Sequence, residues 1–366
     1  MKRRKKESKT LVNVAGELEQ DMFSRKANFI EAVLMMSLLQ IIMWGVWFPL
    51  DIMGKDPLVS YIILGCLALF MFTSPIIHRD TLKGWGMGDP RYIIKSIKEG
   101  GNTRVKILIP VITLPVVAGI AFVLFWADLA DALDLGTDVI DWQDSIGGKI
   151  GIFGIGAAMG FLLIFFVIRL DNFLNALKVA LLVIAILGSS LFLLIIAFDP
   201  DAFVDFDVGG FFLNFLGYIF WGALQQFLFA GYFGTRFRKG FTPAIESPAE
   251  GEEKKLWKKR AIVAIISGSY FGLIHVPAWA LLGFTTILGI ILSWFFMKDQ
   301  NRNLFALGII HGFLGSMVAD AMDIEMSVGP SSVPSQLVPY FWIVGIFLAL
   351  QQIGIMLAWY FMEKRE

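Results

Sequence analysis

Two adjacent amides and two histidines are the polar side chains that lie deepest in the apolar segments of this sequence. Gln225 and Gln226 stand near the inner end of one long apolar segment, and His275 and His311 each stand in a later one. A polar side chain without a partner is costly in such a segment. An imidazole can accept, donate or relay a proton, and a carboxamide can orient a water molecule. These four side chains are therefore the candidate catalytic residues, provided that their segments meet.

The depths of these positions are similar. At ~1.5 Å per residue, Gln225 and His311 each lie roughly 12 Å from the end of their segment that is flanked by basic residues, and His275 lies about 21 Å from it. Pro277 is expected to kink the helix next to His275 and to bring the three positions to one level. Ionisable residues inside a membrane are functional candidates by default. The structural alternative is that each histidine bonds a facing carbonyl group and each glutamine joins two helices.

Composition places these segments in a membrane. The chain has 366 residues, of which 57% are hydrophobic, and several apolar runs approach the ~20 residues that cross a bilayer as a helix. Alternating short strands, which would indicate a barrel, are absent from the sequence. We therefore expect an all-α polytopic membrane protein. The net charge is zero, which argues against a nucleic-acid partner, and the single cysteine, Cys66, excludes a disulfide within the chain.

Ten membrane-spanning helices are predicted. Their expected ranges are 29–50, 58–77, 105–126, 150–169, 173–198, 209–233, 261–282, 284–297, 303–319 and 338–362. The eighth and ninth are short, so re-entrant helices are an alternative there. The chain accordingly divides into a basic tail (1–28), a first group of helices (29–198), a core (209–320) and a last helix with a short tail (338–366).

The loops between these helices alternate in charge. Loops 78–106 and 234–260 are rich in lysine and arginine, whereas loops 127–148 and 199–207 hold six and four aspartates and no lysine or arginine. Basic loops mark the cytoplasmic side of a membrane protein. Both termini are therefore expected in the cytoplasm.

Pairs of glycines four residues apart occur in three of the predicted helices. Such pairs let helix backbones approach closely. They are Gly156 and Gly160, Gly268 and Gly272, and Gly308 and Gly312.

Short motifs surround the four candidate residues. The two glutamines are followed by Phe-Leu-Phe-Ala-Gly, Phe271 stands four residues before His275, and Gly315 stands four residues after His311. In order, spacing and helical context, this pattern resembles the motifs Glu-Glu-x-x-x-Arg, Phe-x-x-x-His and His-x-x-x-Asn of the CAAX protease and bacteriocin-processing (CPBP) family of intramembrane metalloproteases. The resemblance covers residues 209–320, and it implies a CPBP-like helical core there.

The resemblance also implies an activity. Members of the family are hydrolases that cleave prenylated C-terminal peptides, leader peptides or other membrane-associated peptides at the cytoplasmic side, so the implied partners are lipidated or membrane-associated peptides or proteins, and membrane lipid. The first-motif glutamate activates a water molecule, and histidine and asparagine stabilise the oxyanion. Phe271, Gly315 and Ser316 become candidate binding residues, although Ser316 stands about 100° of helix beyond the asparagine position. A zinc ion held by His275 and His311 is the cofactor that the resemblance allows.

The sequence departs from the family at three points. Both glutamates are glutamines, the arginine is Ala230, and the asparagine is Gly315. Glutamine cannot act as a general base at neutral pH and is a poor zinc ligand. Loss of a general base typically lowers a rate by about 10²–10⁴. Glu31, near the basic end of the first predicted helix, is the best carboxylate to replace it.

Two hypotheses follow, with a third of another class. The chain is either a CPBP-type peptidase or a catalytically impaired homologue that binds a membrane protein or a lipid. The lost motif residues favour the second hypothesis on chemistry, whereas the histidines and the motif spacing favour the first. A transporter is the outsider, because the deep carboxylates and paired interrupted helices of ion-coupled carriers are absent from the sequence.

Overall fold

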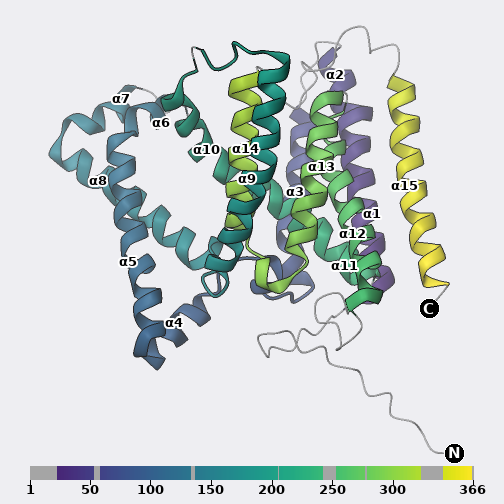
Figure 1. Cartoon of the computed structure of the whole chain (residues 1–366), viewed down its shortest axis with the longest axis horizontal. Coiled ribbons are helices and arrows are strands. Elements are labelled where there is room, and N and C mark those ends of the chain that lie inside the picture. Colours follow the sequence, from purple (N-terminus) through teal and green to yellow (C-terminus); the bar gives the residue numbers. More distant parts are fainter. Residues whose placement is uncertain are drawn as a thin grey trace, which may run out of the picture.

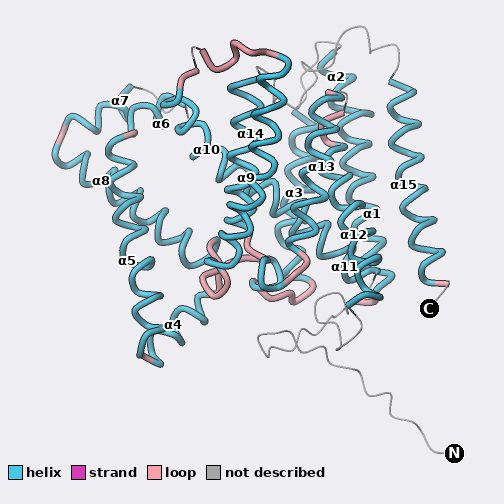
Figure 2. The backbone as a smooth tube through the Cα atoms, viewed as in Figure 1, coloured by secondary structure: helices cyan, strands magenta, loops and turns pink. Residues whose placement is uncertain are grey.

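The computed structural model of the chain is helical throughout. It describes residues 23–52, 58–132, 137–204, 206–241, 253–276, 278–322 and 341–364. Helices cover most of these residues, no strand occurs among them, and Figure 2 shows that the loops are short. Nine helices in this described part are long and apolar enough to cross a membrane. The prediction of an all-α polytopic membrane protein is confirmed.

The long helices stand side by side in Figure 1. They are α1 (Arg25–Ile42), α3 (Leu58–Ile77), α5 (Gly101–Leu124), α8 (Ile146–Leu162), α9 (Phe173–Phe198), α10 (Val208–Gln226), α12 (Glu253–Leu273), α13 (Trp279–Phe296), α14 (Leu304–Met322) and α15 (Phe341–Glu363). Shorter helices connect them: α2 (Phe48–Ile52), α4 (Pro90–Glu99), α6 (Trp126–Ala132), α7 (Thr137–Ile140) and α11 (Gly234–Phe241). The π-helical segment η5 (Phe227–Phe233) joins α10 to α11 without a break, directly after the two glutamines.

The turn between α12 and α13 differs from the prediction. We expected one helix to continue through His275 as far as residue 282, but α12 ends at Leu273 and α13 begins at Trp279. A proline disfavours helical conformation in the residue before it, and the sequence has Pro277 here, a residue outside the described part. His275 therefore lies in the turn after α12. Because it begins at Trp279, α13 has 18 residues, and α14 has 19; both lengths are enough to cross a bilayer.

The seventh predicted helix, α12, is not among the nine. Its first turns carry a run of lysines that ends in Arg260, so its apolar part begins only at Ala261. It is nevertheless packed along α13 as a full member of the bundle, because Gly268 lies directly against the backbone of Ile290. The core therefore contains two closely packed antiparallel pairs, α10 with α14 and α12 with α13.

Charged residues gather at opposite ends of the bundle. Figure 1 places α4 and α11, which carry lysines and arginines, at one end, and α6 and α7, which carry aspartates, at the other. We name them the basic end and the acidic end. The alternation seen in the sequence thus corresponds to two faces of the molecule. The tail 1–22 and the loops 242–252 and 323–340 lie outside the described residues.

Glycines set the helix spacing in the core, as predicted. A Cβ atom added at Gly308 of α14 would lie 2.6 Å from the carbonyl oxygen of Ile219 on α10, and one added at Gly268 of α12 would lie 2.2 Å from the backbone nitrogen of Ile290 on α13. Gly156 of α8 meets the backbone of α5 in the same way. These distances leave no room for a side chain, so the small residues are required for the helix pairs to form.

A buried ionic cluster ties α11 to the loop after α3 at the basic end. Asp80 accepts a hydrogen bond of 2.7 Å from Arg236 Nη2 and one of 2.5 Å from Lys239 Nζ, and all three side chains are buried. Burial alone would raise the pKa of Asp80, but the ammonium of Lys239 and the guanidinium of Arg236 hold it below its ordinary value. The carboxylate therefore stays ionised inside the protein.

Asp80→Asn is expected to lower the free energy of unfolding by about 3–5 kcal/mol, because it removes the buried carboxylate that pairs with both Arg236 and Lys239. Since the pKa of Asp80 is lowered in the folded state, its stabilisation is present above the carboxyl's unfolded pKa and is lost as the pH falls through the folded pKa. Denaturant unfolding in detergent micelles should show a lower free energy of unfolding for the variant at neutral pH. The difference from the native protein should disappear in acid. The exposed Asp201 supplies the control, Asp201→Asn; equal stability of both variants at neutral pH would contradict the role of the cluster.

Candidate functional site

The contact between α10 and α14 brings the first pair of candidate residues together. A Cβ atom added at Gly222 would lie 2.8 Å from Cβ of His311, so the imidazole packs directly on the α10 backbone. One turn further on, Gln226 Nε2 lies 3.2 Å from Nδ1 of His311, and both side chains are buried. With the amide nitrogen as donor, Nδ1 accepts, and the proton of the neutral ring is on Nε2.

A polar cluster at the basic end fixes the start of α14. The buried Arg169 donates to Asp299 at 2.9 Å and to Asp171 at 3.0 Å. Asn303, beside it, donates to the carbonyl oxygen of Arg169 and accepts from the backbone nitrogen of Ala306, which caps the helix. His311 stands about two turns along from this cap. The cluster therefore sets the height of His311 against α10.

His275 is oriented by its own helix end and by α13. Its Nδ1 lies 3.0 Å from the carbonyl oxygen of Phe271, which can only accept, so Nδ1 carries the proton. Thr285 Oγ1 lies 3.1 Å from the same nitrogen and gives its own proton to the carbonyl oxygen of Leu281 at 2.6 Å. Nε2 of His275 therefore holds the lone pair of the neutral ring. At Nε2, His275 is an acceptor and His311 is a donor.

The two imidazoles line one small cavity of about 30 Å³. The ring of Phe271 also lines it, with its centroid 5.5 Å from that of His275 and 5.4 Å from that of His311. Neither Nε2 atom has a hydrogen-bond partner within the described part of the chain. The volume suffices for a water molecule or two. The lone pair and the N–H group are thus both available to a small polar guest.

The structure brings most of the predicted site residues together. Gln225, Phe271 and Gly315 line the cavity, together with the two histidines. Gln226 stands behind it as the partner of His311. Ser316 is different: it is fully buried, its hydroxyl has no partner among the described residues, and it does not line the cavity. Its hydroxyl is therefore not placed to replace the missing asparagine. This agrees with the sequence, in which Ser316 stands one residue after the asparagine position, Gly315.

Glu31 lies in another cluster. Its carboxylate is 2.6 Å from Nε2 of His78, and it accepts hydrogen bonds from Ser74 at 2.8 Å and from the Tyr232 hydroxyl at 2.9 Å. Arg236 lies 3.4 Å away. These contacts hold Glu31 at the basic end, and it does not line the cavity. The expectation that Glu31 supplies the missing base is therefore wrong.

Five residues that line the cavity escaped the sequence reasoning: Tyr218, Trp221, Phe284, Thr285 and Leu288. Thr285 orients His275. It could have been recognised in the sequence as a hydroxyl-bearing residue inside the apolar run of α13. Tyr218 and Trp221 line the cavity from α10, but aromatic residues are frequent in this chain and carried no signal. The side chain of Trp221 is also 53% exposed, so the cavity wall reaches the outer surface of α10.

The donor set around the cavity falls short of a zinc site. Catalytic zinc takes three protein ligands, and no group of three histidine, cysteine or acidic residues that could hold a metal occurs in the part of the chain that the structure describes. Both Nδ1 atoms already have hydrogen-bond partners. Two imidazoles and a carboxamide do not fit the ion, so we assign no chemical step to a metal. Zinc remains an expectation from the family resemblance.

The segment that forms the cavity matches a known protein family. Residues 211–317 match the family model described as "Type II CAAX prenyl endopeptidase Rce1-like". The match runs from the first turn of α10 to the last turns of α14, so it includes all three motifs and the cavity, and it confirms the resemblance seen in the sequence. Comparisons with curated proteins and with solved structures found no match.

Gly222→Ala is expected to destabilise the protein by about 1–3 kcal/mol, because the new methyl group would meet His311 and overpack the contact. Gly217→Ala is the matched control on the same helix, since a Cβ atom there would meet nothing within 4 Å. Denaturant unfolding of both variants in detergent measures the difference. Equal stabilities would show that α10 and α14 are not in this close contact.

Proposed function

Because residues 211–317 form an Rce1-like domain of the CAAX protease family, we propose that this membrane protein binds lipidated or other membrane-associated peptides and hydrolyses them slowly or not at all. The observation that supports the proposal is the lining of the cavity. The lining residues include two histidines, one glutamine and two residues with a hydroxyl group, Tyr218 and Thr285, and none of them carries a carboxylate.

The site is suited to hold a peptide carbonyl group. The Nε2–H group of His311 and the amide of Gln225 are hydrogen-bond donors on the cavity wall. Fixed donors of this kind stabilise the negative charge that develops on a carbonyl oxygen. The attacking water has no carboxylate to take its proton, and such a loss typically lowers a rate by about 10²–10⁴. Binding chemistry is retained and proton abstraction is weakened.

A peptide reaches the cavity along α10. Trp221 belongs both to the cavity wall and to the outer surface of that helix. The volume of about 30 Å³ accepts a carbonyl group and a water molecule, not a whole peptide. The peptide backbone therefore lies at the surface beside Trp221 and inserts a carbonyl group toward the histidines.

An active peptidase with His275 as its base is the second candidate. The lone pair on Nε2 of His275 borders the same cavity as the N–H donor of His311. Its Nδ1–H group is held by the carbonyl oxygen of Phe271 and by Thr285. A base oriented by a further group is the arrangement that activates nucleophiles in hydrolases.

Restoring the acidic motif distinguishes the two candidates. We expect negligible cleavage of a lipidated peptide by the native protein in vesicles, and a gain in the double variant Gln225→Glu plus Gln226→Glu. A buried glutamate has a raised pKa and suits a general base. Ala230→Arg is added if one carboxylate must be held ionised.

The control for this experiment is His275→Ala. In the native background it should change little, and in the restored background it should abolish the gain. Robust native cleavage that His275→Ala or His311→Ala removes would contradict the impaired site, and its loss in His275→Ala would support the second candidate.

We further propose that the basic end faces the cytoplasm, with both termini on that side, because basic loops are retained there. In a background where the exposed Cys66 is replaced by serine, Lys98→Cys and Asp141→Cys place single thiols at the basic and acidic ends. A membrane-impermeant maleimide applied to intact cells should label only the thiol at 141. Labelling at 98 would invert the orientation, and labelling at both would refute the span count.

A further inference from the structure

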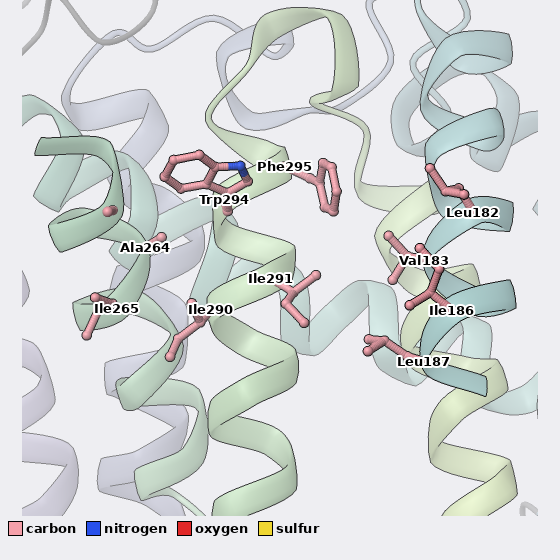
Figure 3. A pocket seen from close by; sticks show the side chains of 11 residues that line it. Leu182, Val183, Ile186, Leu187, Ala264, Ile265, Ile290, Ile291, Trp294 and Phe295 are labelled. Carbon is pink, nitrogen blue, oxygen red and sulfur yellow. The ribbon is translucent and has the colours of Figure 1, made fainter. Parts of the chain in front are cut away.

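A second hollow in the bundle is an apolar groove between α9 and the pair α12–α13. Its volume is about 420 Å³, and its lining carries no polar surface. Figure 3 shows α13 in the middle, with Ile291 and Phe295 directed toward α9 and with Ala264 and Ile265 of α12 on the other side. The groove is separate from the histidine cavity, and nothing below depends on the proposed function.

The groove opens to the surroundings of the membrane-spanning helices. Leu182 and Ile186 on its α9 wall are each 57% exposed, and Ile265 on the α12 wall is 52% exposed. α9 packs mainly on α14 rather than closing the groove. In a bilayer such a space is filled by hydrocarbon, because water is excluded and no side chain occupies it.

The end of the groove toward the basic end carries a buried cation. Arg260 precedes the groove residue Ala261 and is only 9% exposed. Its guanidinium lies 4.2 Å from the ring centroid of Trp294, and its Nε donates to the carbonyl oxygen of Trp294 at 3.2 Å. No carboxylate in the described part of the chain pairs with it. A buried charge without a counter-ion is costly, so this side chain favours an anion beside it.

A second cation stands across the groove. Lys178 lies four residues before Leu182 on α9, so the two share a face of the helix, with Lys178 nearer the basic end. It is exposed and makes no ion pair within the residues that the structure describes. Arg260 and Lys178 thus stand next to the lining residues Ala261 and Leu182 toward the basic end, and neither has an acidic partner among the residues that the structure describes.

We propose that this groove binds one anionic phospholipid, with an acyl chain between α9 and α13 and the headgroup phosphate beside Arg260 and Lys178. The apolar lining matches the acyl chain, and the two cations, which form no ion pair within the described residues, match the phosphate. A zwitterionic lipid fits the groove equally well but lacks the net charge. Selection among lipids therefore comes from the two basic residues.

Native mass spectrometry of the full chain, released from nanodiscs of phosphatidylglycerol and phosphatidylcholine, tests the proposal. One phosphatidylglycerol molecule should remain bound to the native protein. Lys178→Gln should weaken its retention about fivefold, the effect of one surface cation, and the buried Arg260→Gln about tenfold or more. Lys98→Gln, an exposed cation of α4 away from the groove, is the control and should have no effect.

Filling the groove supplies a test that leaves the charges intact. Ile186→Trp should displace the lipid, whereas Leu193→Trp, an exposed position of α9 that does not line the groove, should retain it. Equal retention of the two phospholipids, or equal effects of Arg260→Gln and Lys98→Gln, would overturn the proposal. Displacement of the phospholipid by an uncharged lipidated peptide would overturn it too, and would assign the groove to the lipid of a substrate.

Discussion

The close contact of α10 with α14 is the constraint on which the site depends. Gly222 and Gly308 remove the side chains that would separate the two backbones, and His311 fills the space against α10. At this separation the amide of Gln226 reaches the imidazole, and two polar groups that hydrocarbon would penalise satisfy each other. The hydrogen bond therefore depends on the close packing of the two helices. It also fixes which nitrogen of His311 carries the proton.

The same hydrogen bond limits the chemistry of the site. A carboxamide pairs with a neutral imidazole without bringing charge into the membrane, whereas a carboxylate at the same place would be a charged base or a costly neutral acid. Buried carboxylates are found instead at the basic end, where Asp80 and Asp299 pair with buried cations. The cavity thus holds two imidazoles that are each oriented by a hydrogen bond at Nδ1, and none of the described residues that line it carries a carboxylate.

How much the sequence predicts depends on the range of the contacts involved. The length of the apolar runs predicted the helices, and the charge of the loops predicted the two ends. The spacing of the motifs predicted that Gln226 and His311 meet. These features are visible in short stretches of the sequence. The turn after Leu273 was misplaced because residues 261–297 are mostly apolar and contain no charged residue, and only Pro277 marks the break. The role of Glu31 was wrong because its partners, His78 and Arg236, come from distant parts of the chain. No spacing rule reports such contacts.

Histidine tautomers test the central claim most directly. The chain has three histidines, so spectra of ¹⁵N-histidine-labelled protein in detergent contain three ring systems, which His78→Gln and Gly222→Ala help to assign. The structure predicts opposite tautomers in the cavity, with the proton on Nδ1 in His275 and on Nε2 in His311. The same tautomer for both rings, or a proton on Nδ1 of His311, would contradict the account of an acceptor and a donor that share one cavity.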